Sequence, residues 1–449
     1  MEIEKLKKIK NPIFYITNDV SRAIGLENIL PNFHIVCLDD NKLVDSLIKS
    51  GISVFCLEKE TGKKNFIRRN SGLILSHPKV LEFIDKTAKG ERPNLIFFKP
   101  QKRIEIIAEG QNFNLIGNTV AVSQLFEDKL SFFNICKKEK IDCIDGEIGF
   151  LSGYSFSGLK NRYSLPFVIQ LEQGWAGNST FFINSEEEFS ELQKTKNNHE
   201  VKILKFIDGI TILNNAAVFK DKVYFSKPAL QIKSNSILSS LPAATGGRQW
   251  PAILEPEQLE KINRITYRVG KIMSNSGYRG FFGLDFIISS ENGKVYLSEN
   301  NARLTASSSF YTKLETEKNI FPLLGYHLLS FLPDYVPENE VDYNAPEIFG
   351  SEIVCRNNEK YRIKITNDLV PGVYNTDLSF IKESYFLNSN QNDVFWLTSA
   401  AKDRIVSPET EIFKTNFRSA VCDKFGELFD DKKTLLKSLK EKLKIVKND

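Results

Sequence analysis

The chain has 449 residues, which is enough for two or three domains of the usual size. Apolar residues make up 41% and charged residues 26%, an ordinary balance for a folded globular protein that excludes extensive disorder. With 60 basic and 56 acidic residues the formal net charge is +4, so the overall charge indicates neither nucleic acid nor an anionic membrane as a partner.

No stretch of about 18 uninterrupted apolar residues occurs. The first residues, MEIEKLKKIKNPIFYI, lack the apolar core and the small-residue cleavage site of a signal peptide. We therefore expect a soluble, cytoplasmic protein without a membrane partner.

Six cysteines are scattered through the chain without a CxxC pair, and the four histidines lie far apart in sequence. This pattern favours buried, reduced thiols over a zinc ribbon or a disulfide framework. It also argues against a histidine metal site or a histidine-driven triad. We expect chemistry that is carried by carboxylates and cations.

The first 118 residues alternate between strand and helix patterns. Strands are expected at IFYIT, HIVCL and ISVFCL, with a polar helical stretch after the first and a helix through NKLVDSLIKSG. NLIFFK and NLIGN continue the alternation on either side of the helical KRIEIIAEG. No GxGxxG or GxxxxGK-S/T motif follows these strands, so we predict an open parallel sheet without a dinucleotide site.

From about residue 119 the pattern changes to α+β. One helix is expected through SQLFEDKLSFFNICKKEKI, followed by antiparallel strands at LPFVIQLE, STFFI, VKILKFI, ITILNNAAVF and VYFSKPALQI. Ser185 and Glu188 form a capping box before a short helix. Residues 256–277 show the apolar spacing of a long amphipathic helix.

After residue 333 a stretch rich in proline and acids is typical of a linker. Strands follow, and then the basic amphipathic segment DDKKTLLKSLKEKLKIVK. This segment is compatible with a helix that binds a partner or membrane, but the pattern favours a helix with a solvated lysine face.

The segment GFFGLDFIISSENGKVYLSENNAR is typical of a β-hairpin. A three-residue ENG loop, with Gly293 in the left-handed position, pairs Ser290 with Lys294. The same count along both strands places Asp285 directly opposite Glu299. Asn301 and Arg303 follow on the same face as Glu299, because alternate residues of a strand share a face.

Two carboxylates that face each other across a ladder are destabilising unless a cation lies between them. Mg²⁺ takes one or two carboxylates together with phosphate oxygens, and Asn301 offers a further oxygen. Arg303 is suited to contact a phosphate or an oxyanion. The alternative from spacing alone is an exposed hairpin with ordinary ion pairs among these side chains.

An Asp followed by an E-x-N-x-R run resembles the metal-binding strand pair of the ATP-grasp superfamily. Asp285, Glu299, Asn301 and Arg303 match that run. Upstream, FEDKLSFF places Lys129 where the family has its first nucleotide-contacting lysine. LPFVIQLEQGWAGNSTFFI resembles the strand, glycine-rich phosphate loop and strand that close over ATP, with the loop glycines at Gly174 and Gly177.

VKILKFIDGITI resembles the hinge strand of the same family, whose backbone meets adenine at Lys205, Phe206 and Ile207. The motifs run in family order from about 119 to 310. The resemblance implies a multidomain α/β and α+β chain with an ATP-grasp fold. Its expected parts are an N-terminal open parallel α/β domain (1–118), a nucleotide-binding domain (119–335) and a small C-terminal α+β region (336–449).

The sequence departs from the family where the strand before the phosphate loop usually ends in a phosphate-contacting lysine. Gln170 stands at that position. An amide donates a hydrogen bond but does not neutralise charge, so either nucleotide binding is weaker or another cation substitutes. Lys202, Lys205 and Lys227 are the candidates.

A second glycine pair lies in LPAATGGRQWP, which we expect to be a loop. It needs no functional role as an ordinary loop. Within the ATP-grasp resemblance, a mobile glycine loop carrying Arg248 is suited to grip a carboxylate substrate or an acyl phosphate.

The resemblance implies a ligase that joins a carboxylate to an amine through an acyl phosphate, using ATP and Mg²⁺, with Mn²⁺ as an allowed substitute. Asp285, Glu299 and Asn301 are then the metal ligands, and Arg303 and Arg248 act on the reacting groups. Small-molecule carboxylates and amines, such as amino acids or a peptide, are the expected substrates, with residues after about 340 shaping the acceptor site. The resemblance also allows a homodimer.

Three alternatives remain at this stage. A carboxylase or kinase would use the same nucleotide site. A nucleotide-binding pseudoenzyme would explain Gln170. A nucleic-acid-binding protein would use the basic C-terminal segment, although the sequence has no recognisable motif for it.

Overall fold

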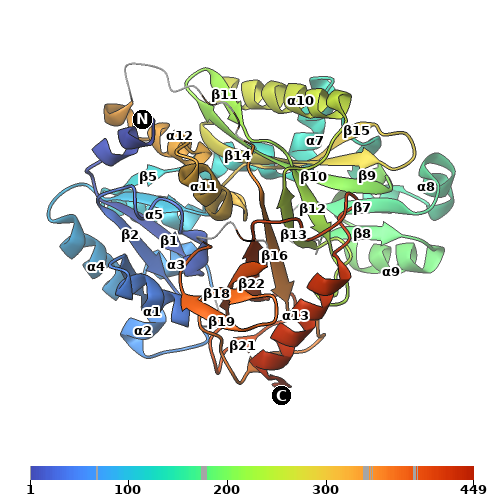
Figure 1. The fold of residues 1–449 in the computed structure, drawn as a ribbon. Helices are drawn as coiled ribbons and strands as arrows, with labels where there is room; N and C mark the ends of the chain where they lie inside the picture. Colours follow the sequence, from blue (N-terminus) through green and yellow to red (C-terminus); the bar gives the residue numbers. More distant parts are fainter. Residues whose placement is uncertain are drawn as a thin grey trace.

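The computed structural model describes residues 2–66, 69–172, 179–336, 343, 345, 347–387, 391 and 393–448. In these residues the strands form four sheets, of five, four, eleven and three strands. Figure 1 shows the N-terminal segment at one side of the molecule and the C-terminal strands below the central sheets. No helix of the described residues has both the length and the apolar character needed to span a bilayer.

The N-terminal sheet is open and parallel, as predicted, with the order β3-β2-β1-β4-β5. Its strands are almost wholly buried because helices cover both faces. The polar stretch after the first strand is wrong as a predicted α-helix, since only a 3-10 turn forms there (Val20–Arg22), capped by Asp19. The strands are β1 (Ile13–Thr17), β2 (Phe33–Cys37), β3 (Ser53–Cys56), β4 (Asn94–Phe97) and β5 (Asn114–Ile116), and the helices are η1 (Glu2–Lys8), α1 (Lys42–Lys49), α2 (Leu57–Thr61), α3 (Ser71–Leu75), α4 (Pro78–Ala88) and α5 (Lys102–Gly110).

The single helix predicted after residue 119 is two helices, α6 (Val120–Glu127) and α7 (Lys129–Lys138). Asp128 takes an extended conformation between them, and its carboxylate accepts a hydrogen bond from the backbone N–H of Ser131. This N-cap competes with a continuous helix and starts a new one. Lys129 therefore stands at the first position of α7.

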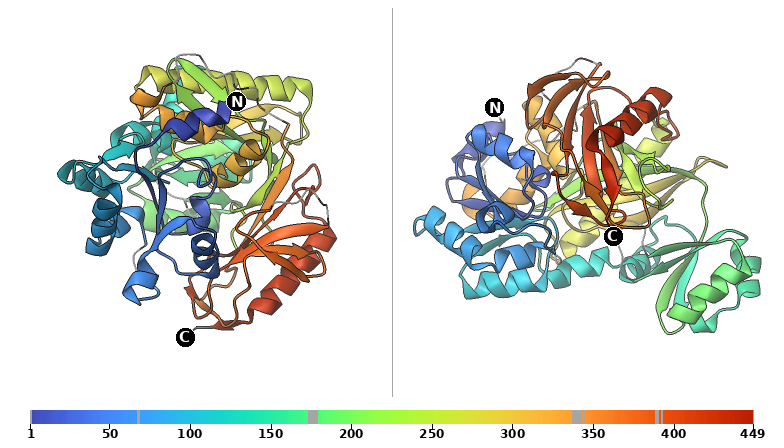
Figure 2. Two further views of the ribbon diagram at one scale, coloured as in Figure 1. Left: turned by 60° about the vertical axis from the view of Figure 1, so that its left-hand side comes forward. Right: turned by 90° about the horizontal axis from the view of Figure 1, so that it is seen from below.

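A four-stranded sheet forms a small lobe that projects from the body of the molecule (Figure 2). Its order is β6-β9-β7-β8, and all its pairs are antiparallel. One face packs on α8 (Phe156–Tyr163) and α9 (Glu186–Lys196) through residues such as Phe167 and Ile203. The strands are β6 (Gly146–Phe150), β7 (Phe167–Leu171), β8 (Thr180–Ile183) and β9 (Glu200–Lys205).

The largest sheet has eleven strands and runs through both the middle and the C-terminal parts of the sequence. Its order is β15-β14-β10-β12-β13-β16-β22-β20-β18-β19, with β11 paired to β10. The strands are β10 (Gly209–Phe219), β11 (Lys222–Phe225), β12 (Ala229–Lys233), β13 (Thr245–Trp250), β14 (Gly280–Ser289), β15 (Val295–Asn301), β16 (Gly350–Arg356), β18 (Gly372–Asn375), β19 (Phe380–Glu383), β20 (Val394–Ser399) and β22 (Glu411–Phe417).

Helices lie on both faces of this sheet. The long helix predicted over 256–277 is α10 (Pro256–Asn275), which contributes Ile262, Ile265 and Met273 to one core. The other face packs on α11 (Ser308–Glu317) and α12 (Leu323–Leu329) and on the N-terminal sheet. The predicted loop LPAATGGRQWP is wrong in part, because its second half is the buried strand β13.

The C-terminal helix α13 (Asp430–Leu443) buries its leucines in the same core as α10. Of its five lysines, two are exposed, two are half-buried and Lys432 is buried, so the expected solvated lysine face is only partly formed. A small sheet of β17 (Ile363–Ile365), β21 (Ile405–Val406) and β23 (Ile445–Lys447) lies beside it. The division at 118/119 and 335/336 stays a proposal, and β13 and β16 are paired across the second boundary.

Candidate active site

The hairpin of β14 and β15 places Asp285 directly opposite Glu299, as predicted. The predicted turn is wrong by one residue, because Ser289 pairs with Lys294 around a four-residue loop. A β-bulge at Ser298 adds one residue to β15 and restores the predicted register beyond it. Both carboxylates therefore lie on one face of the sheet.

Asp285 and Glu299 are both acids, so their like charges repel each other. Burial, and then the charge of Glu299, raise the pKa of Asp285 to about 8, while Arg303 and Arg248 oppose the rise. The Lys129 ammonium lies 4.0 Å from a Glu299 oxygen. A divalent cation between the acids would favour the ionised form of both.

These residues fit a magnesium ion that is completed by phosphate and water oxygens. Asp285 and Glu299 supply two hard oxygen donors, the number that Mg²⁺ commonly takes from protein. The Asn301 carbonyl oxygen accepts a hydrogen bond from Arg303 at 2.8 Å, and its NH₂ group donates to Asp285 at 3.4 Å. Asn301 thus orients Arg303 and Asp285, and the second lone pair of its carbonyl oxygen stays available to the proposed metal. Among the described residues, no group of three or more His, Cys, Asp or Glu side chains is arranged to hold a metal ion.

Arg303 is fixed from several sides. Its Nε donates to Glu127 at 3.0 Å, and one terminal nitrogen donates to the Leu304 carbonyl oxygen at 3.1 Å. Its guanidinium lies 5.0 Å from the ring centre of Phe98, and the guanidinium of Arg22 lies 4.7 Å from the same ring. Such a preorganised cation is suited to stabilise negative charge that develops nearby.

Lys129 lies near the acid pair, and Gln170 stands on β7 of the small lobe. Lys129 is 8% exposed, and its ammonium donates to the Ser179 hydroxyl at 3.3 Å. The Gln170 amide donates to the Thr180 hydroxyl at 3.2 Å, while its carbonyl oxygen is buried without a hydrogen-bond partner. Gly174 and Gly177 of the expected phosphate loop lie outside the described residues.

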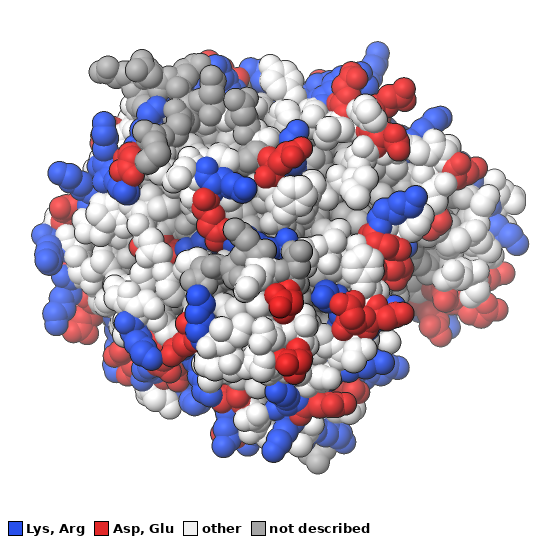
Figure 3. All heavy atoms as spheres, viewed as in Figure 1, with Lys and Arg blue, Asp and Glu red and all other residues white. Residues whose placement is uncertain are grey.

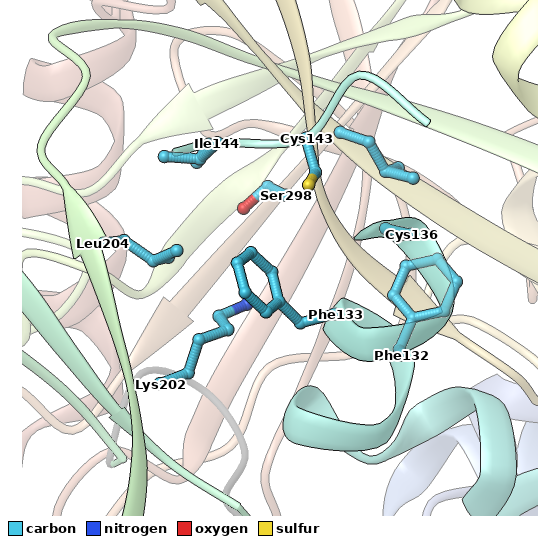
Figure 4. A pocket seen from close by; sticks show the side chains of 9 residues that line it. Phe132, Phe133, Cys136, Cys143, Ile144, Lys202, Leu204 and Ser298 are labelled. Atoms are coloured by element: carbon cyan, nitrogen blue, oxygen red, sulfur yellow. The ribbon is translucent and has the colours of Figure 1, made fainter. Parts of the chain in front are cut away.

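A small pocket with polar and apolar lining lies between α7, β9 and β15 (Figure 4). Phe133, Ile144, Val168 and Leu204 form a small buried cluster here, and the predicted hinge residues Phe206 and Ile207 pack against it. The Lys205 side chain is exposed, and its backbone N–H donates to the Asp145 carbonyl oxygen. The pocket is lined by Phe132, Phe133, Cys136, Cys143, Ile144, Lys202, Leu204, Leu297 and Ser298.

Arg248 is buried in β13 and is not part of the mobile loop that we expected. It lies opposite Glu352 of β16, with 3.6 Å between the guanidinium and the carboxylate. Its Nε has no hydrogen-bond partner. The strand register puts Arg248 on the same face of the sheet as Asp285.

A network of charged residues joins this face to the end of β1, and no sequence pattern predicted it. Lys414 lies 3.0 Å from both Asp19 and Glu411, and Arg22 lies 3.1 Å from Glu411. Although burial opposes it, Lys414 and Arg22 hold the pKa of the Glu411 carboxyl well below its usual range. Ligands often bind at the carboxyl ends of parallel strands, where Asp19 and Arg22 stand.

One face of the molecule carries mixed charge. On the face shown in Figure 3, basic and acidic side chains are interspersed and neither sign gathers into a large patch. This face gives no support to the nucleic-acid alternative.

This chain is similar to known proteins in sequence and in fold. No protein-family model matches the sequence. A curated biotin carboxylase from Haemophilus influenzae is 26% identical over 212 residues, which are 44% of this chain and 44% of that protein. The match thus spans less than half of that relative's length.

Solved structures match over most of the chain. Biotin carboxylase from Campylobacter jejuni has a TM-score of 0.61 and 15% identity, covering 91% of this chain and 88% of that one. The biotin carboxylase domain of the Hydrogenobacter thermophilus 2-oxoglutarate carboxylase has a TM-score of 0.60 and 15% identity, covering 91% and 86%. N5-carboxyaminoimidazole ribonucleotide synthetase from Thermotoga maritima has a TM-score of 0.56 and 12% identity, covering 98% and 100%. This chain shares the fold of these proteins, in agreement with the ATP-grasp fold that the sequence predicted.

Proposed function

We propose that this chain is an ATP-dependent ligase that joins a carboxylate to an amine through an acyl phosphate. The observation that carries the proposal is the acid pair Asp285 and Glu299 with the fixed Arg303 beside it. Related structures were solved with ATP, ADP or MgADP, which supports the choice of nucleotide. Mg²⁺, or Mn²⁺ in its place, belongs to the same proposal.

In this mechanism the residues position the reactants and neutralise charge. A substrate carboxylate oxygen attacks the γ-phosphorus of ATP, the bond to the ADP oxygen breaks, and an acyl phosphate forms. The amine then attacks the acyl carbon, phosphate leaves, and the amine loses a proton to give the amide. Asp285, Glu299 and Asn301 would hold the metal, which when bound neutralises phosphate charge, and Arg303 would stabilise the oxyanion on the acyl carbon.

The charged network beside Arg248 supports a carboxylate substrate that carries an amino group. Arg248 has an unpartnered donor, and Lys414 lies on the same strand face as Asn416, which neighbours Glu352. Buried cations of this kind recognise carboxylates, and Asp19 and Glu352 are placed to meet an ammonium group. An amino acid or a short peptide has both groups.

A carboxylase is the second candidate, because the related proteins are named biotin carboxylase and carboxyaminoimidazole ribonucleotide synthetase. One of those structures is described with bicarbonate and as a dimer. Bicarbonate-dependent turnover would favour this candidate. Sedimentation of the full chain would test a homodimer.

The test is ADP release from ATP and magnesium with pooled amino acids and small carboxylates, and separately with bicarbonate. We expect substrate-stimulated release that Glu299→Gln abolishes, because the acid pair then loses one charge. Glu291→Gln is the matched control, since Glu291 is exposed in the turn of the same hairpin. Equal turnover by wild type and Glu299→Gln would contradict the proposed site.

A further inference from the structure

The phosphate-contacting lysine that the ATP-grasp resemblance places at position 170 is absent, but a lysine faces that position from the next strand. Gln170 of β7 pairs directly with Lys202 of β9. Directly opposite residues of an antiparallel ladder point to the same face of the sheet. Lys202 therefore presents its side chain to the side on which the missing lysine would stand.

The other lysine of this strand is excluded by the same geometry. Lys205 pairs with Phe167, which belongs to the core on the helix-covered face of the small lobe. Its side chain is exposed and lies on the opposite face from Lys202. Lys202 and Lys205 are three positions apart, and side chains at an odd spacing along a strand point to opposite faces of the sheet.

Lys202 is buried at the pocket near the acid pair. It is 4% exposed, and its ammonium lies 5.5 Å from the ring centre of Phe133 (Figure 4). The charged and titratable groups that face it are Glu299 of β15, Lys129 of α7, Cys136 of α7 and Cys143. A lysine is almost never buried without a charge partner, which suggests a role for it here.

We propose that Lys202 takes the place of the missing lysine at position 170 and neutralises the phosphates of the bound nucleotide together with Lys129. This inference rests on the proposed nucleotide site. Gln170 then serves as a neutral neighbour that is held by Thr180.

The electrostatics of the pocket agree with this role. Burial lowers the pKa of Lys202 to about 8, with Glu299 opposing the fall and Lys129 adding to it. A polyanion between the two ammonium groups would relieve their repulsion and favour the charged form of Lys202. The charges around the pocket therefore favour binding of a negatively charged ligand.

The first experiment measures MgADP and adenosine binding to the full chain by calorimetry. Lys202→Gln is expected to weaken MgADP binding by about tenfold or more and to leave adenosine binding unchanged, because it removes a charge-assisted contact to phosphate. The exchange Gln170→Lys with Lys202→Gln returns a lysine to the same face and is expected to restore most of the MgADP affinity. Lys160→Gln, on an exposed position of α8, is the control.

A Lys202→Gln protein that binds MgADP as tightly as wild type would overturn the inference and leave the nucleotide site standing. A wild-type protein that binds no nucleotide would instead remove the proposed function. A second measurement needs no variant: the rate of acylation of Lys202 in the wild-type protein is followed by peptide mapping. MgADP is expected to protect Lys202 and adenosine is not, whereas equal labelling with both would overturn the inference.

Discussion

The incomplete pairing of the buried Arg248 side chain indicates what kind of substrate it binds. Arg248 is 4% exposed, its guanidinium has one carboxylate at 3.6 Å, and its Nε has no hydrogen-bond partner. Burying a charge with incomplete pairing destabilises a fold unless a ligand completes it. Within the proposed function, that ligand is the carboxylate substrate.

We therefore expect Arg248→Gln to raise the KM for the carboxylate by about tenfold or more, because a charged hydrogen bond to the substrate is lost. The Kd for MgADP should stay unchanged, since the nucleotide phosphates are assigned to other residues. Steady-state kinetics and calorimetry measure the two quantities. Arg264→Gln on the exposed face of α10 is the control, and an equal loss of MgADP affinity would contradict the assignment.

His327 predicts a loss of stability in mild acid. It is buried in α12, its Nδ1 accepts a hydrogen bond from the Phe281 N–H at 3.1 Å, and burial lowers its pKa to about 4. The folded protein keeps the imidazole neutral where the unfolded chain, with a pKa near 6.5, binds a proton. This stability is fully present above about pH 6.5 and is lost as the pH falls toward 4.

The fall in the free energy of unfolding that this pKa difference predicts is about 3 kcal/mol. Urea unfolding of wild type and His327→Gln between pH 7 and pH 4 measures it. We expect the free energy of unfolding of the wild type to fall toward that of the variant as the pH falls. Parallel pH profiles of the two proteins would show that His327 does not titrate in this way. Comparison with the variant cancels the carboxylates that titrate over the same range.

At this scale the sequence predicted the acid pair and Arg303 but not their partners. Alternation along a strand is local, so Glu299, Asn301 and Arg303 could be placed on one face without a structure. The contacts of Arg22 with Glu411 and of Lys414 with Asp19 join residues almost 400 positions apart. No local pattern encodes such a pair.

At the scale of elements, the β14–β15 hairpin was predicted in the right place for a partly wrong reason. The turn has one residue more than expected, and the bulge at Ser298 compensates for it. Leu297 donates its backbone N–H to the Asp142 carbonyl oxygen, which lies on a segment after α7. A bulge that is stabilised by a distant segment cannot be predicted from the hairpin's own sequence.

The strand β13 was missed because its glycines are typical of a loop. Gly247 has φ +138°, and a Cβ there would lie 1.9 Å from the Glu352 carbonyl oxygen. Glycine is needed here because β16 comes too close for any side chain. The pairing partner that requires this glycine lies about a hundred residues away.

Gly247→Ala should therefore destabilise the protein by about 3 kcal/mol, since it combines backbone strain with a clash. Gly51→Ala is the control, because Gly51 also has a positive φ (+84°) but has no atom within 4 Å of the added Cβ. That change should cost only about 1 kcal/mol. Thermal unfolding compares the two, and an equal effect would show that the close approach to β16 is easily relaxed.

At the scale of the whole molecule, a buried ion pair ties the N-terminal sheet to the C-terminal strands. Arg404 donates to both carboxylate oxygens of Glu58, at 2.7 Å and 2.5 Å, and Glu58 is 1% exposed. The same arginine also bonds the Asp40 carbonyl oxygen at 3.2 Å. Two regions distant in sequence are thereby held in one arrangement.

Arg404→Met should destabilise the protein by about 3–5 kcal/mol, because it leaves the Glu58 charge buried without its partner. The double change Glu58→Gln with Arg404→Met should cost clearly less, since no charge is then stranded. Urea titration of the two variants and wild type decides this. If the double variant were no more stable than the single one, the stranded charge would not be the cause.

The strand pairing of the eleven-stranded sheet determines which segments of the chain can be exchanged between related proteins. A chain that ends after Tyr335 would keep β13 but lose β16, so β13 would present a row of unpaired backbone groups that other copies could extend. The small lobe differs, because the ladders of β6, β7, β8 and β9 close among themselves. Swapping that lobe between relatives leaves every long ladder of the body intact, whereas the last hundred residues have to be inherited together with the strands that they pair with.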